Sequence, residues 1–388
     1  MNVLLSLLHS SPEYESLRAM LDAGQTAAVS GVSQIARAHW IAALHEDTGR
    51  PVVAVCQDEM AASRLAAELT AFLGQPPVTL PSRELTFLDA AGVSREWEQR
   101  RLRILYDLSA GRISVLVTTL EALQLRTIPK STLYAASIRL TAGGSYDLDK
   151  LTEQLTAAGY TRASLVEGAG QFALRGGILD VYSPACENPL RAEFFGDELD
   201  TMGYFDPITQ RRTENVEEAV LLPVAETEAH LHPQGTAGLC EDLRAIIARQ
   251  QRRKTPNQAL IDTLQKDCEA LENETLFASA DRYMALIYPE FTTAAAYLSQ
   301  EAVVAFCDHG NLQRAEKEKA EEFGLLLDSF LTSGTLFGEL CDYYGSIEDL
   351  AAQLRGRAVV YCDGFLAARY PESLPPKKLL SFTARQLP

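Results

Sequence analysis

The chain has 388 residues, of which 47% are hydrophobic and 22% are charged, and its formal net charge is −17. This length exceeds one ordinary core and predicts two or three domains, and the composition excludes wholesale disorder. The negative charge disfavours non-specific nucleic-acid binding by the chain as a whole, because such binding depends on cations that neutralise phosphates.

The seven cysteines are scattered without a CxxC pair. This spacing argues against a zinc ribbon and fits unpaired thiols in a reducing cytoplasm. No stretch of about 18 apolar residues predicts a membrane span, and the N-terminal MNVLLSLLHSSPEYESL lacks the basic region of a signal peptide. We therefore expect a cytoplasmic protein with no membrane partner, no metal and no cofactor.

Residues 1–144 alternate between apolar runs and amphipathic segments. Val52–Cys56 and Ile113–Val117 are short apolar runs, typical of strands buried on both faces. Asp58 can cap the helix that follows the first run, and Gly74 can end it. Strand–helix–strand repetition predicts an α/β fold with a parallel sheet and helices on both faces.

The segment TAAVSGVSQIARAHW lies where a nucleotide-binding fold places its phosphate loop, between a strand and a helix. A working loop reads G-x-x-x-x-G-K-[ST], with backbone amides and Lys on the phosphates and a hydroxyl on Mg²⁺. Here Gly31 is kept, but Ala36, Arg37 and Ala38 replace the second Gly, the Lys and the hydroxyl. The pattern predicts an inactive, structural loop.

Residues 145–225 predict a small inserted α+β domain. A helix is expected from about Asp147 to Ala158, ending at Gly159. Glycine- and proline-containing turns then separate short β-branched or aromatic runs, which predict an antiparallel sheet. The expected strands are Phe172–Arg175, Ile178–Tyr182, Arg191–Phe195, Met202–Phe205 and Ala219–Pro223.

Residues 226–388 predict a helical insertion followed by the second part of the first domain. His230 and His232 have no further ligand at metal spacing, so we expect a solvated histidine pair. The basic run at 249–254 (RQQRRK) is interpreted as a solvated helix end. Ala302–Cys307 and Val359–Cys362 predict further buried strands.

The stretch from Gly168 to Arg212 carries the motifs FALRGGILDVY, LRAEFFGDE and FDPITQR. With these motifs the chain resembles domain 2 of the UvrB-like module at the N-terminus of bacterial transcription-repair coupling factors (Mfd), and a weaker similarity extends over essentially all 388 residues. The resemblance implies a degenerate P-loop (RecA-like) domain with an inserted UvrA-binding-like domain. It also implies that more polypeptide follows in the family, whose other domains bind RNA polymerase and translocate on DNA.

By this resemblance, Arg175, Arg191 and Phe195 match the family's UvrA-contacting residues. Arginine offers a planar fork for carboxylates and phenylalanine an apolar anchor. The alternative is that the arginines are ordinary surface ion-pair partners and that Phe195 is core. We expect Arg191→Glu to abolish UvrA binding without changing the thermal melt.

In an active motor of this class, Asp-Glu would follow the strand at 302–307, whereas here Asp308 is followed by His309. UvrB also inserts a long aromatic hairpin that clamps DNA, and LTFLDAAGVSREWEQR is too short to form it. These departures favour a non-catalytic adaptor that recruits UvrA to stalled RNA polymerase. The alternatives are a UvrB-like ATPase or helicase fragment of excision repair and a purely structural domain without a partner of its own.

Overall fold

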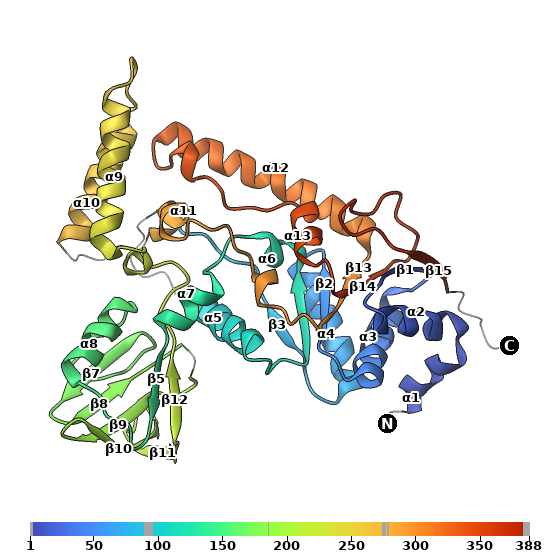
Figure 1. The fold of residues 1–388 in the computed structure, drawn as a ribbon, viewed down its shortest axis with the longest axis horizontal. Coiled ribbons are helices and arrows are strands. Elements are labelled where there is room, and N and C mark those ends of the chain that lie inside the picture. The colour runs from blue at the N-terminus through green and yellow to red at the C-terminus, as the bar shows by residue number, and fades with distance from the viewer. Residues whose placement is uncertain (1–2, 89–95, 185, 274–276, 278, 383–388) are drawn as a thin grey trace.

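A computed structural model describes residues 3–88, 96–184, 186–273, 277 and 279–382. The short segment expected to lack a DNA-clamping hairpin includes residues 89–95, which lie outside the described residues. Figure 1 shows a parallel sheet with its helices on one side of the molecule, and a smaller antiparallel domain and a helical hairpin on the other. This division follows the change of pattern along the sequence.

The larger sheet has seven strands, all parallel, in the order β15-β1-β14-β13-β2-β4-β3. Its strands are β1 Thr26–Ser30, β2 Val52–Cys56, β3 Val78–Leu80, β4 Val115–Thr119, β13 Val303–Cys307, β14 Ala358–Cys362 and β15 Lys378–Ser381. Strands from the last quarter of the chain therefore lie between β1 and β2. The expectation that the first domain resumes after the insertions is confirmed.

Helices cover both faces of this sheet because its strands are apolar on both faces. Val53 and Val55 pack into one core, and Val52 and Ala54, which point the opposite way, pack into another. The helices of this part are α1 Val3–Ser6, α2 Pro12–Asp22, α3 Gln34–Thr48, α4 Glu59–Leu73, α5 Glu96–Ser109, α6 Leu120–Gln124, α7 Lys130–Ala136, α12 His309–Ser333 and α13 Ile347–Gln353. Asp58 caps α4 and Gly74 ends it in the left-handed conformation, as the sequence predicts.

The inserted domain has a six-stranded sheet in the order β11-β10-β9-β8-β7-β6, and α8 and a two-stranded ribbon of β5 and β12 share its core. The bounds are β5 Ile138–Thr141, α8 Leu148–Ala157, β6 Thr161–Arg162, β7 Gln171–Arg175, β8 Ile178–Val181, β9 Leu190–Phe195, β10 Glu198–Phe205, β11 Arg212–Asn215 and β12 Glu218–Leu221. Because β5 pairs with β12, this unit begins near Ile138. We therefore propose that this domain begins near 138 rather than at 145.

The helical insertion follows the inserted domain. Its helices are α9 Gly235–Gln251, α10 Gln258–Glu272 and α11 Met284–Ile287, and the short 3-10 helices of the chain are Leu7–Ser10, Ala229–Leu231, Ala280–Tyr283, Ala294–Tyr297 and Gly338–Leu340. None of the helices in the described ranges has the length and apolar character needed to span a bilayer.

A buried charge network fixes the junction between these parts. Glu226, fully buried, accepts a hydrogen bond of 2.6 Å from Nε of Arg101 in α5, and Nη1 of Arg83 lies 3.6 Å from it. Arg83 also pairs with Asp281, beyond the helical hairpin. Three distant regions of the sequence, around residues 83–101, 226 and 281, thus meet at the base of the inserted domain.

Candidate functional site

One face of the inserted sheet carries Arg175, Arg191 and Phe195. Arg175 ends β7, and Arg191 and Phe195 belong to β9. In the register of the sheet Arg175 lies opposite Ile178, and Asp180 lies opposite Arg191. Since side chains four apart in a strand point the same way, all three residues share the face opposite to the α8 core. The structure therefore brings the three predicted residues together.

Asp180 organises this face. Its carboxylate is buried and accepts hydrogen bonds of 2.7 and 2.9 Å from Nε and Nη2 of Arg191. The second oxygen also accepts a bond from Nη2 of Arg175. One carboxylate thus holds both guanidinium groups. Arg191 is further fixed because its guanidinium lies 4.4 Å from the centre of the Phe205 ring and donates to Gln210.

The three residues differ in how much of the side chain is exposed to a binding partner. The side chain of Arg175 is 46% exposed, that of Arg191 is 19% exposed, and Phe195 is 84% exposed. The reading of Phe195 as a core residue is therefore wrong. Arg191, in contrast, is partly buried and pairs with the buried carboxylate of Asp180, so the expectation that Arg191→Glu leaves the thermal melt intact does not fit the structure.

The sequence reasoning missed Asp180. It stands in ILDVY between Leu179 and Val181, which both pack into the domain core. Alternation along this strand places Asp180 on the opposite face, directly across from Arg191. An acidic residue between two core residues, on a strand next to one that carries an arginine, was the feature of the sequence that could have predicted this pair.

The loop between β1 and α3, which the sequence predicts to be an inactive phosphate loop, is closed by other parts of the chain. The amides of Gly31 and Val32 donate to the carbonyls of Gly364 and Asp363, each at 3.1 Å. Ser33 caps α3, and its hydroxyl accepts from the amide of Ala36. Gly31 has φ of 81°, and a Cβ built there would lie 1.9 Å from the carbonyl oxygen of Phe382. The backbone of Phe382, directly after β15, thus occupies space beside the loop.

Arg37 and Asp308, which the sequence places in two different predicted motifs, form one ion pair. Nη2 of Arg37, in α3, lies 2.7 Å from Oδ2 of Asp308, at the end of β13. Ala38 has no hydroxyl to offer a metal ion. The charges that sequence reasoning treated separately therefore neutralise each other at the carboxyl edge of the sheet.

His309 is built into the core next to this pair. Its ring is fully buried, stacks on Tyr370 at 5.3 Å and meets the edge of Tyr361 at 5.0 Å. Burial lowers the pKa of His309 to about 4, so the ring is neutral at physiological pH. Its backbone amide donates to Asp363 at 2.7 Å. The structure thus gives His309 a packing role.

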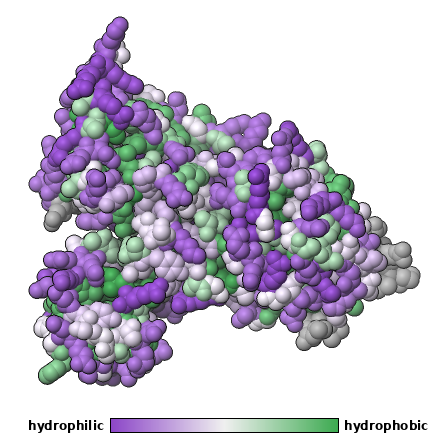
Figure 2. Space-filling view, viewed as in Figure 1, coloured by the Kyte–Doolittle hydropathy of each residue, from purple (hydrophilic) through white to green (hydrophobic). Residues whose placement is uncertain are grey.

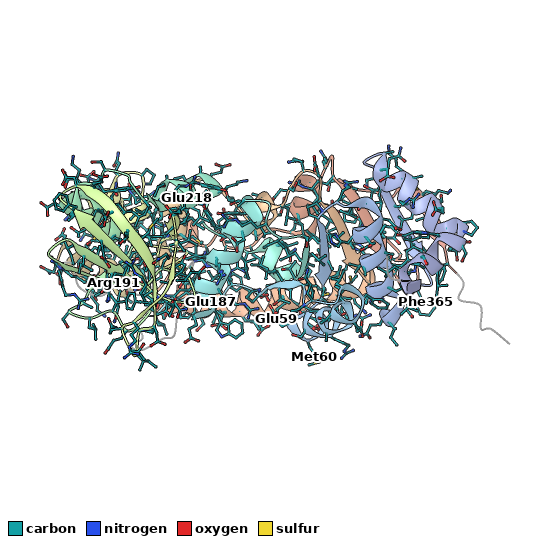
Figure 3. The ribbon with its side chains drawn as sticks, turned by 90° about the horizontal axis from the view of Figure 1, so that it is seen from below. Glu59, Met60, Glu187, Arg191, Glu218 and Phe365 are labelled. Atoms are coloured by element: carbon teal, nitrogen blue, oxygen red, sulfur yellow. The ribbon has the colours of Figure 1, made fainter. Side chains whose placement is uncertain are left out.

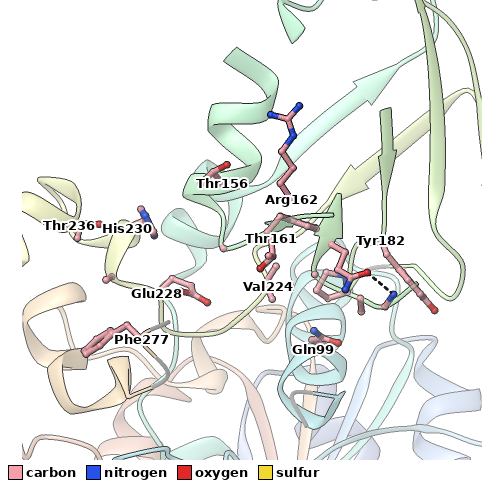
Figure 4. A pocket seen from close by; sticks show the side chains of 18 of the residues that line it. Gln99, Thr156, Thr161, Arg162, Tyr182, Val224, Glu228, His230, Thr236 and Phe277 are labelled. Carbon is pink, nitrogen blue, oxygen red and sulfur yellow. Dashed lines mark hydrogen bonds between the residues drawn. The ribbon is translucent and has the colours of Figure 1, made fainter. Parts of the chain in front are cut away.

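A large cleft separates the inserted domain from α5 and α9. It has a volume of about 1670 Å³, and Figure 2 shows the hollow between the two arms of the molecule. Figure 4 shows Gln99, Thr156, Arg162, Tyr182 and Glu228 around it. Its lining mixes cations, carboxylates and hydroxyls. Among the described residues, no group of three His, Cys, Asp or Glu side chains could hold a metal ion.

One histidine of the expected solvated pair differs from the prediction. His230 is exposed, as the sequence predicts. His232 is buried, and its Nε2 lies 3.3 Å from Asp242 of α9. The difference arises because the linker folds onto the start of α9, which covers His232.

Comparisons with known proteins agree with this architecture. Residues 138–226 match the family model described as the UvrB interaction domain. A transcription-repair-coupling factor from Myxococcus xanthus is 37% identical over 214 residues, which cover 53% of the chain and 18% of the relative. The corresponding protein of Bacillus subtilis (strain 168) is 23% identical over 100% of the chain and 33% of the relative. That of Staphylococcus aureus (strain USA300) is 23% identical over 93% of the chain and 31% of the relative.

The similarity therefore runs along the whole chain, and its clearest part is the inserted domain. The chain spans about a third or less of the length of these relatives. The resemblance inferred from the motifs in residues 168–212 is confirmed.

Proposed function

We propose that this chain, a UvrB-like module of the transcription-repair coupling factor type, is a non-catalytic adaptor that recruits UvrA of nucleotide excision repair to stalled RNA polymerase. The observation that carries the proposal is the shared face of Arg175, Arg191 and Phe195 on a domain that matches the UvrB interaction domain. The relatives' name, transcription-repair-coupling factor, supports the link between transcription and repair.

The face has the chemistry of a protein-binding site. Phe195 exposes 84% of its surface, and Ile178, which lies across from Glu193 on the same face, is 38% exposed. Exposed aromatic side chains beside arginines are typical interface anchors. One nitrogen of Arg175 donates to Asp180, and because the side chain is 46% exposed, its guanidinium can also donate to a carboxylate of the partner.

The geometry supports a passive frame rather than a motor. Two loop amides donate to carbonyls of the same chain, and the guanidinium of Arg37 is paired with Asp308. A UvrB-like ATPase would need these groups for phosphates and Mg²⁺. We therefore propose that the chain does not bind or hydrolyse nucleotide, and that ATP-driven translocation and polymerase binding belong to other regions of the longer relatives.

Binding to purified UvrA tests the proposal. Phe195→Ala removes an exposed ring without touching the core, so we expect UvrA binding to weaken by about tenfold or more while the melting temperature stays unchanged. Phe365→Ala is the matched control, because Phe365 is also a phenylalanine, is 92% exposed and lies at the opposite end of the molecule from Arg191 in Figure 3.

Equal binding by wild type and Phe195→Ala would overturn the assignment of the face. Loss of binding in Phe365→Ala alone would place the UvrA contact on the parallel-sheet domain instead. We propose the cytoplasm as the location, which the seven free cysteines favour.

A further inference from the structure

The helices α9 and α10 form an antiparallel hairpin that projects from the molecule. Figure 1 shows it rising beside α12, with the connecting turn at its far end. The two helices pack against each other through apolar side chains, among them Leu243, Ile247, Leu260 and Leu264. The hairpin is therefore a formed structural element.

The hairpin tip (residues 251–257, QRRKTPN) is strongly cationic and fully solvated. All its residues are exposed, and none of Arg252, Arg253 and Lys254 forms an ion pair within the described residues. Between Asp242 and Asp262 the chain has basic residues but no acidic one. Figure 2 shows this arm ending in hydrophilic side chains. Such a concentration of positive charge is unexpected in a chain of net charge −17.

The tip is held in a defined position. Gly334, after the end of α12, packs so closely on the start of α10 that an added Cβ would lie 2.6 Å from the amide nitrogen of Leu260. Arg249 pairs with Glu339 at 3.1 Å, and the side chain of Asn257 caps α10. The cations are thus presented on a braced support, which reduces the entropy lost on binding.

The side chains of the tip point to the class of partner. Its only apolar residue is Pro256, so the tip lacks the aromatic or aliphatic anchor of a protein interface. It also lacks the aromatic rings on which single-stranded bases stack. Arginine, lysine, glutamine, asparagine and threonine are the side chains that donate to phosphate oxygens.

We propose that the hairpin tip binds the phosphate backbone of double-stranded DNA without sequence preference. Arg252, Arg253 and Lys254 neutralise phosphates, and Gln251 and Thr255 add neutral hydrogen bonds. Because the rest of the chain is acidic, the contact is confined to the tip and orients the module on the duplex. The adaptor would then touch DNA through its own residues, independently of the face that carries Phe195.

Fluorescence anisotropy with a labelled duplex of mixed sequence tests this proposal on the whole chain. The variant Arg252→Ala, Arg253→Ala, Lys254→Ala is compared with Arg314→Ala, Lys317→Ala, Lys319→Ala, which removes three exposed cations from α12. We expect the tip variant to bind at least about tenfold more weakly at low salt and the slope of log K against log salt to fall by about 2 to 3. The α12 variant should bind like the wild type.

Four outcomes would overturn the proposal, and the first three are no binding of the wild type at low salt, an equal loss in both variants, and a preference for single-stranded DNA. A fourth is competition by polyglutamate as effective as competition by unlabelled duplex, which would make the tip a site for acidic protein segments. Both variants should keep UvrA binding, since the cations lie outside the inserted domain, so the two proposals can fail separately.

Discussion

Arg37 and Asp308 are 271 residues apart in sequence, yet Nη2 of the first lies 2.7 Å from Oδ2 of the second. Arg37 stands in α3, where the sequence predicts an inactive phosphate loop, and Asp308 directly follows β13. Their ion pair makes both side chains part of the frame of the sheet domain, because each charge neutralises the other. The first prediction follows from this pair.

We expect Mg·ATP to leave the melting temperature of the chain unchanged. A nucleotide present at about 100 times its dissociation constant would stabilise the fold by about 2.7 kcal/mol, which a thermal melt detects readily. The variant Ala36→Gly, Arg37→Lys, Ala38→Thr, which restores the motif, should also fail to bind, because Gly31 and Val32 already donate their amides to carbonyls of the chain. Tight binding by that variant would show that the substitutions alone inactivate the loop.

Arg191→Glu should destabilise the inserted domain. The substitution puts a second carboxylate beside the buried Asp180 and removes its main partner, and breaking a buried pair costs about 3–5 kcal/mol. Arg175→Ala, at a half-exposed position, should cost about 1 kcal/mol or less. Urea denaturation of the two variants measures the difference. Similar midpoints would mean that the buried carboxylate of Asp180 does not need Arg191 for its stability. Any loss of UvrA binding in Arg191→Glu must be compared with the loss of stability of the same variant.

His309 should make the fold sensitive to acid. Burial lowers the pKa of its ring from 6.5 to about 4 in the folded chain, so between these values the unfolded chain binds the proton more tightly. Its contribution to stability is therefore complete above pH 6.5 and is lost as the pH falls towards 4, by up to about 3 kcal/mol.

The variant His309→Phe isolates this contribution. Phenylalanine can keep the contacts with Tyr361 and Tyr370 and leaves no buried ring nitrogen without a partner. Relative to the wild type, the variant should become more stable as the pH is lowered from 7 to 5, measured by urea denaturation at each pH. A difference that does not change with pH would contradict the assignment.

Glu226→Gln should loosen the junction of the inserted domain. Burial opposes ionisation of Glu226, but Arg101 and Arg83 outweigh it and lower the pKa of the carboxyl group, which is therefore charged at neutral pH. Removing that charge takes away the carboxylate that pairs with buried Arg101 and leaves Arg83 with Asp281 alone. We expect a loss of about 3–5 kcal/mol. Hydrogen exchange should speed up in β5 and β12 as well as near α5. Faster exchange in β5 and β12 alone would mean that the network does not join the two parts.

Much of the architecture follows from local patterns in the sequence. Val52–Cys56, Val303–Cys307 and Ala358–Cys362 are apolar throughout, and a strand of this kind is stable only when both faces are covered. Asp58 and Gly74 mark the ends of α4 because an N-cap and a left-handed C-cap act within one turn of the helix. Alternation in β9 likewise places Arg191 and Phe195 on one face.

Only the tertiary structure decided how these elements use their side chains. It paired Arg37 with Asp308, placed Asp180 between Arg175 and Arg191, and joined β5 to β12 across the inserted domain. The basic run at 249–254 is a solvated helix end, as the sequence predicts, since α9 ends at Gln251 and the next residues are exposed. The tertiary structure adds that this end is the tip of a braced hairpin. A strand or a helix cap depends on the few residues around it, so the local sequence predicts it. Ion pairs and strand pairs between distant segments form only in the complete fold, which decides which charges and apolar surfaces are removed from water.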